Sequence, residues 1–339
     1  MEPIAATIKL KALNENPYYY RPQLFTDCND NDIAMIPFDI LVNCPLSSIC
    51  SLTDVILQPH INNKDVHSWV NDFENGVWQT EKFENFVWDN IKETALSKKE
   101  RDALQLNGEM SVLKESAKKL RLLDSDNTGG EIAEIFLYGI LRHGFGALPI
   151  VPKIFYKQNS NDYAKGADSV HITIKDGDFC IWYGEAKFYN DISDARLQTI
   201  VDSVYNTIQE DKLKKENSII RNVSDIAEYV TDESILNAIL DLLGPSRSID
   251  YLKPHLHVPI MLLHECNITQ QETHMTSQYK SKMIDYHKER ANAYFKKQIQ
   301  SCSGIDIYDS ISFHLFLFPV PMKETIVDRF KQQANVIRK

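Results

Sequence analysis

One segment constrains the fold of this 339-residue sequence more than any other. It consists of two short stretches with an alternating residue pattern, joined by an Asp-Gly dipeptide at 176–177. Residues 170–174 and 179–183 alternate in the way that strands with one buried face do. Asp-Gly favours a two-residue type I′ turn, because both turn positions need a positive φ. We therefore predict a β-hairpin in which Lys175 pairs with Asp178, and this turn fixes the register of the whole hairpin.

The predicted register brings two acidic side chains together at the open end of the hairpin. Counting back from the turn, Ile172 faces Ile181 and Asp168 faces Glu185, and Lys187 lies on the same face two residues further along. Charged groups that end an apolar face are unfavourable unless they are paired or coordinated, and neighbouring carboxylates repel each other. A divalent cation would resolve this conflict. The alternative is an ordinary surface cluster in which Lys187 bridges the two acids.

A predicted helix before the hairpin carries a third acidic candidate. The segment 131–141 is mainly apolar, yet it contains Glu131 and Glu134, which lie three residues apart and share a helix face. Glu131 falls in the first turn, where the helix dipole favours any acid. Glu134 lacks that explanation. We interpret Glu131 as a helix cap and Glu134 as an oxygen ligand of a metal ion.

The order of these residues resembles the PD-(D/E)xK nuclease superfamily, in which an acid on a helix is followed by an Asp and a Glu-x-Lys motif on neighbouring strands. The matching positions are Glu134, Asp168 and the segment 185–187 (Glu-Ala-Lys). Ala167 stands where the named motif has Pro, a change that leaves the acidic positions intact. The sequence also resembles the HamA family, the small subunits of Hachiman anti-phage defence systems, in GEIAEIFLYGIL (130–141), KGADSVHI (165–172) and WYGEAKFY (182–189).

The resemblance implies a Mg²⁺-dependent (or Mn²⁺-dependent) deoxyribonuclease that hydrolyses phosphodiester bonds. It implies that Asp168 and Glu185 bind the ions and that Glu134 completes the oxygen shell. Lys187 would position or deprotonate the attacking water. The resemblance further implies an effector of anti-phage defence that is held in a complex with a helicase partner, HamB.

Two other functions are open on the sequence. The chain could be a non-catalytic interaction or regulatory subunit of a helicase complex, in which the same side chains are kept without activity. A site-specific restriction enzyme with a DNA-reading N-terminal part is disfavoured, because residues 1–120 contain no recognised DNA-binding motif or net basic face.

The composition bears on the partners. The formal net charge is −10, whereas proteins that bind nucleic acid alone usually present a basic surface, so DNA binding is expected to need a cation or a partner protein. The sequence contains no GxxxxGK[ST] loop, so any ATP-driven step belongs to another chain. With no long apolar segment and no apparent signal peptide, we expect a cytoplasmic protein without a membrane partner.

Strands that alternate with helices predict an α/β (α+β) fold: a restriction-endonuclease-like mixed sheet flanked by helices. We predict this nuclease-like domain over 124–339, after a smaller α+β accessory domain over 1–123, with the boundary in the loop 124–130 (DSDNTGG). The spacing of aromatic residues over 64–88 predicts a helix near the junction. Later elements are helices within 193–243, 277–300 and 323–338 and strands at 257–264 and 312–319.

The helix that follows the Glu-x-Lys motif has polar residues at four-residue spacing. Asp194, Gln198 and Asp202 share one face that could turn toward the acidic pair and contact the substrate backbone. Exposure to solvent is the favoured interpretation for all three.

Overall fold

The computed structural model describes residues 36–50, 54–121, 129–152, 154, 167–222 and 225–339. Its main feature is a seven-stranded sheet with the order β1-β2-β9-β8-β7-β6-β5. The strands are β1 (Asp39–Pro45), β2 (Lys64–Val70), β5 (Leu148–Val151), β6 (Ser169–Lys175), β7 (Asp178–Tyr189), β8 (Leu256–Glu265) and β9 (Ser312–Val320). A separate small hairpin joins β3 (Phe73–Glu74) and β4 (Val77–Trp78).

The sheet is mixed, as the sequence predicted. Strands β2, β9, β8 and β7 run parallel to their neighbours, whereas β1, β6 and β5 pair antiparallel at the two sides. Almost every residue of β8 and β9 is buried, which explains their nearly continuous apolar sequences. These two strands form the centre of the molecule, and the hairpin β6–β7 is attached directly beside β8.

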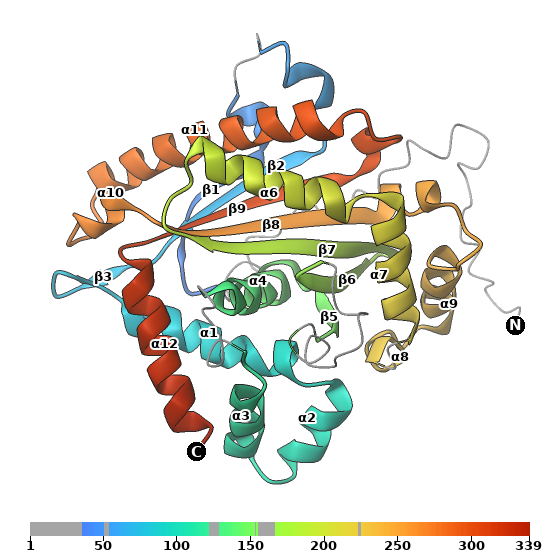
Figure 1. Ribbon diagram of the computed structural model, residues 1–339, viewed down its shortest axis with the longest axis horizontal. Coiled ribbons are helices and arrows are strands. Elements are labelled where there is room, and N and C mark those ends of the chain that lie inside the picture. Colours follow the sequence, from blue (N-terminus) through green and yellow to red (C-terminus); the bar gives the residue numbers. More distant parts are fainter. Residues whose placement is uncertain (1–35, 51–53, 122–128, 153, 155–166, 223–224) are drawn as a thin grey trace, which may run out of the picture.

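Helices cover both faces of the sheet (Figure 1). On one face lie α6 and α11, and on the other lie α1, α4 and α12. The helix bounds are α1 (Thr80–Ala95), α2 (Lys98–Gln105), α3 (Glu109–Lys118), α4 (Gly130–Phe145), α6 (Asp194–Thr207), α7 (Glu210–Asn222), α8 (Asp225–Tyr229), α9 (Glu233–Leu242), α10 (Asn267–Gln270), α11 (Ser277–Cys302) and α12 (Lys323–Ile337).

The hairpin has the predicted turn and register. Asp176 and Gly177 have φ values of 52° and 82°, as a type I′ turn requires. Residue pairing runs without interruption from Lys175 with Asp178 to Ser169 with Gly184. The alternation of β7 also divides its side chains between two cores: Ile181 and Tyr183 pack under α6 and α11, whereas Trp182 and Ala186 pack against α4.

The N-terminal segment adds strands to this same sheet. β2 pairs with β9, and β1 pairs with β2. Helix α1 packs on α4 in the core that also contains Trp182. The expected division into 1–123 and 124–339 therefore does not separate two sheets or two cores within the described residues, and most of the loop chosen as boundary lies outside them.

The helix expected over 64–88 was wrong in its first part. Residues 64–70 form β2, and the helix begins only at Thr80. Trp69 and Val70 are buried in a strand that pairs on both sides, so tertiary hydrogen bonding overrides the helix-like spacing of the aromatic residues. The helices and strands expected after residue 193 are all present in the described structure.

Gly184 sits where a larger residue cannot fit. A Cβ atom at this position would lie 2.1 Å from Ser169 Oγ and 2.9 Å from Leu137 Cδ2. We predict that Gly184→Ala lowers the free energy of unfolding by about 1–3 kcal/mol, because the strand must move away from α4. Chemical denaturation measures the change. Gly304→Ala is the control, since a Cβ there meets no atom within 4 Å, and an equal loss in both variants would contradict the prediction.

His171 on β6 gives the fold a specific response to acid. The ring is fully buried beside Tyr138, and burial lowers the pKa of His171 from 6.5 to about 3. The folded state keeps this ring neutral while the unfolded chain takes up a proton, so its contribution to stability is lost as the pH falls from 6.5 toward 3. At pH 4 the loss is about 3 kcal/mol by proton linkage.

We therefore predict that His171→Leu makes the free energy of unfolding less dependent on pH between 6.5 and 4. Denaturation curves at several pH values measure this slope. His274→Leu at an exposed position serves as the control and should keep the slope of the unchanged protein. A slope in His171→Leu equal to that of the unchanged protein would show that His171 does not titrate in this way.

Candidate active site

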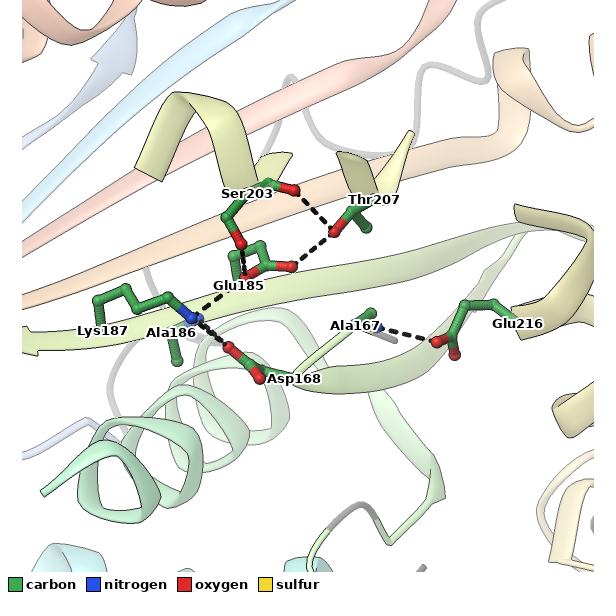
Figure 2. A network of polar contacts seen from close by, with 8 residues as sticks. All are labelled: Ala167, Asp168, Glu185, Ala186, Lys187, Ser203, Thr207 and Glu216. Carbon is green, nitrogen blue, oxygen red and sulfur yellow. Dashed lines mark hydrogen bonds and ion pairs between the residues drawn. The ribbon is translucent and has the colours of Figure 1, made fainter. Parts of the chain in front are cut away.

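The candidate site lies at the open end of the β6–β7 hairpin, where one lysine contacts two carboxylates (Figure 2). Lys187 Nζ lies 2.9 Å from Asp168 Oδ2 and 3.3 Å from Glu185 Oε2. Glu185 and Lys187 project from the same face of β7, and Asp168 comes directly before β6. The structure thus brings together the three residues that the sequence predicted as catalytic.

Asp168 departs slightly from the predicted pairing with Glu185. Its amide donates to the Gly184 carbonyl oxygen at 2.7 Å, one residue away from the strict register. Its carboxylate accepts the Ala186 N–H at 3.1 Å. The strand ladder ends at Ser169, so the chain is free to turn the Asp168 side chain across the neighbouring strand toward Lys187.

Glu185 is a buried carboxylate with three donors. Its side chain is 5% exposed. The Ser203 hydroxyl donates to Oε2 at 2.9 Å and the Thr207 hydroxyl donates to Oε1 at 2.6 Å, in addition to the Lys187 contact. Burial and then the charge of Asp168 raise the pKa of Glu185, against the opposing effects of Lys187 and the two hydroxyls.

Lys187 holds its proton firmly in this setting. Burial opposes its charge, but the carboxylates of Asp168 and Glu185 outweigh that effect and raise the pKa of Lys187 above its ordinary value. The side chain is therefore an ammonium group at neutral pH. In this form Lys187 can donate hydrogen bonds and stabilise negative charge, but it cannot accept a proton.

The helix α6 contributes side chains that the sequence analysis did not select. Ser203 and Thr207 lie four residues apart and face Glu185 (Figure 2). By contrast, Asp194 and Asp202 are exposed, which confirms the expectation for the acids, whereas Gln198 is half-buried and donates to Asp202. The signal was available in the sequence, since Ser203 and Thr207 border the apolar stripe of this helix.

Glu216 on α7 fixes the backbone next to Asp168. Its Oε1 accepts the Ala167 N–H at 2.9 Å, and its side chain is buried. Glu216 occupies the apolar face of α7 together with Leu213 and Ile220, three and four residues away. An acid in such a position requires a partner, and this is the signal that could have identified it.

The structure places Glu134 on the other side of the sheet from Glu185. Helix α4 packs in the core with Trp182 and Ala186. Near the start of α4, a Cβ on Gly129 would lie 3.2 Å from Phe188, and further along the helix Leu137 lies beside Gly184. Because the residue numbers rise along α4 while they fall along β7, the two elements run antiparallel. Glu134 therefore lies opposite the stretch of β7 between these contacts, which is the stretch that carries the site.

The two acids of the helix differ in their contacts. Glu131 lies in the first turn of α4 but accepts the backbone N–H of Arg121, which is outside that helix, at 3.0 Å, so this bond does not support its predicted role as a helix cap. Glu134 is buried, with 8% of the residue exposed. Within the described part of the chain, no three His, Cys, Asp or Glu side chains are already grouped as metal ligands. The role of Glu134 as a ligand stays a prediction.

The donor set nevertheless suits a hard divalent cation. Asp168 and Glu185 offer carboxylate oxygens on one side of the hairpin, and Mg²⁺ sites commonly take one or two carboxylates together with water and substrate phosphate. A carboxylate has about four lone-pair positions, and the contacts named above use three on Glu185. Burial first and the charge of Asp168 second raise the pKa of Glu185, and a bound cation would offset both effects.

The fold and the site define a mixed α/β protein whose central sheet presents two acids and a lysine at the end of one hairpin. The chain belongs to the HamA family, because the family model matches residues 47–334. Membership indicates an anti-phage defence protein of the Hachiman type. No curated protein matches the sequence. Among the described residues, every helix is too short or too polar to cross a bilayer.

Removing the Glu216 carboxylate should destabilise the start of β6. We predict that Glu216→Ala lowers the free energy of unfolding by about 1–3 kcal/mol, because the buried Ala167 N–H loses its acceptor. Glu216→Gln keeps a carbonyl oxygen in place and should lose clearly less. Denaturation of both variants tests this difference, and equal losses would contradict the role of the hydrogen bond.

Proposed function

We propose that this protein is a metal-dependent DNA nuclease of the PD-(D/E)xK type and the effector subunit of its defence system. The observation that carries the proposal is that Asp168, Glu185 and Lys187 meet with the Glu185 side chain only 5% exposed, which does not fit an ordinary surface cluster. The carboxylates lie close enough to repel each other, which favours a cation between or beside them. Family membership supports the same conclusion through the defence role.

Asp168 and Glu185 would hold Mg²⁺ or Mn²⁺, with water and substrate phosphate as further ligands. When bound, such an ion polarises the scissile phosphate and lowers the pKa of a coordinated water. The chain itself supplies rigid positions for its carboxylates, because backbone N–H groups, hydroxyls and Lys187 all donate to them.

Lys187 would stabilise charge rather than accept a proton. The sequence left two roles open, positioning or deprotonating the attacking water. The contacts of Lys187 Nζ with both carboxylates favour the first, because they place the ammonium group where it can orient the water and offset charge. An ammonium beside the phosphate would offset the negative charge that develops during hydrolysis and would orient the water by hydrogen bonding.

The net charge of −10 suggests that DNA reaches this site with help. We propose that the helper is a helicase subunit of the HamB type in a cytoplasmic complex, which would also provide ATP hydrolysis. The competing function is a non-catalytic subunit that binds and regulates the helicase. Such a subunit would need no cation.

The test is degradation of plasmid DNA in the presence of Mg²⁺ by the protein alone and in its complex with the helicase. We expect Asp168→Ala, Glu185→Ala and Lys187→Ala each to reduce degradation on the order of 100-fold or more, since each removes charge stabilisation at the reacting phosphate. Chelation of Mg²⁺ should have the same effect on the unchanged protein.

Asp202→Ala is the matched control, because it removes an exposed acid from α6 whose named contact is Gln198. This variant should degrade DNA at the unchanged rate. Absence of Mg²⁺-dependent degradation by an intact complex of the unchanged protein would rule out the nuclease and favour the regulatory subunit.

A further inference from the structure

We propose that Ser203 and Thr207 are positioning residues that hold the Glu185 carboxylate in the orientation needed to bind a divalent cation. The proposal rests on the proposed nuclease function and names the part of the fold that prepares the acidic side chain for the ion. Figure 2 shows both hydroxyls above Glu185 on neighbouring turns of α6.

The two hydroxyls contact different oxygens of the same carboxylate. Ser203 Oγ lies 2.9 Å from Oε2, and Thr207 Oγ1 lies 2.6 Å from Oε1. Two donors on two oxygens fix both the position of the carboxylate and its rotation about the last side-chain bond. A single donor would leave that rotation free, because this torsion is broad for Glu.

Thr207 has a second acceptor in reach, and the distances decide between them. Its Oγ1 is 3.1 Å from the Ser203 carbonyl oxygen but only 2.6 Å from Glu185 Oε1. A hydroxyl donates one proton, and hydrogen bonds to an ionised oxygen are the shorter and stronger ones. The Thr207 hydroxyl therefore donates to Glu185 Oε1. If Glu185 moves away, the hydroxyl can donate to the Ser203 carbonyl oxygen instead.

The placement of these residues on α6 runs against ordinary packing. The helix buries Leu197, Ile200, Val201 and Val204 against the sheet, and Thr207 continues that buried stripe. An apolar side chain at 207 would extend the core. A hydroxyl there is unfavourable unless it is hydrogen-bonded, and Glu185 is the nearer of its two acceptors.

Neutral donors have an advantage over Lys187 in this role. The Lys187 ammonium contacts Oε2 at 3.3 Å, and its positive charge competes with a cation for the same carboxylate. Ser203 and Thr207 satisfy the buried carboxylate without adding charge. They can keep their contacts when a cation approaches the remaining lone-pair position, as groups that orient metal ligands do.

The test measures binding of Mn²⁺ to the full-length chain by isothermal titration calorimetry, without DNA. Thr207→Val removes the hydroxyl at nearly constant shape, and Thr207→Ser keeps it. We expect Thr207→Val and Ser203→Ala to raise the Kd for Mn²⁺ roughly 10- to 100-fold, as loss of a group that orients a ligand typically does. Thr207→Ser should restore most of the affinity, which a purely structural role of the side chain would not explain.

Thr199→Val is the matched control, since Thr199 is exposed on α6 and donates to the Ala195 carbonyl oxygen. Its Kd should equal that of the unchanged protein. Circular dichroism and thermal unfolding without metal verify that each variant is folded. If Thr207→Val unfolds, the deciding comparison is between Ser203→Ala, which loses a hydroxyl, and Thr207→Ser, which keeps one.

The outcomes separate this proposal from the proposed function. If the unchanged protein binds Mn²⁺ and Asp168→Ala does not, the metal site stands. An unchanged Kd in Thr207→Val and Ser203→Ala then overturns the positioning role alone. If the unchanged protein binds no Mn²⁺, the metal-dependent function fails and the positioning proposal fails with it.

Discussion

The structure around the site depends on one unfavourable feature, the burial of the Glu185 carboxylate under helix α6. A charged group removed from water must find donors, and each nearby element supplies one. Lys187 comes from the same strand, and Ser203 and Thr207 come from the helix above. Asp168 joins through the shared lysine. Glu185 is thus part of the packing of α6 on the sheet.

The strand β7 serves two purposes because its side chains alternate. One set, including Trp182 and Ala186, packs against α4, while the other set carries Tyr183, Glu185 and Lys187 toward α6. Close packing on the α4 side leaves no room for a Cβ at position 184. Strand β7 is therefore packed closely against α4 on one face, and Glu185 is hydrogen-bonded to α6 on the other. A preorganised site requires this rigidity.

The family match covers most of the sheet. The matched range, 47–334, includes β2, which pairs with β9 at the far side of the sheet from the hairpin. Parallel strands that lie next to each other here are far apart in the sequence, so the N-terminal strands, the central strands and the site form one folded unit in the described residues. A division into accessory and catalytic parts would have to cut through this sheet.

The sequence by itself determined the hairpin, its turn and its register, because the period of two and the Asp-Gly turn are local properties that few alternatives satisfy. It also determined that Asp168, Glu185 and Lys187 meet, and it predicted the helices and strands after residue 193. Only the tertiary structure decided that 64–70 is a strand, that Ser203 and Thr207 donate to Glu185, and that Glu216 accepts the Ala167 N–H. Those contacts join residues distant in the chain, and their geometry depends on how helices pack on a sheet, which local patterns do not specify.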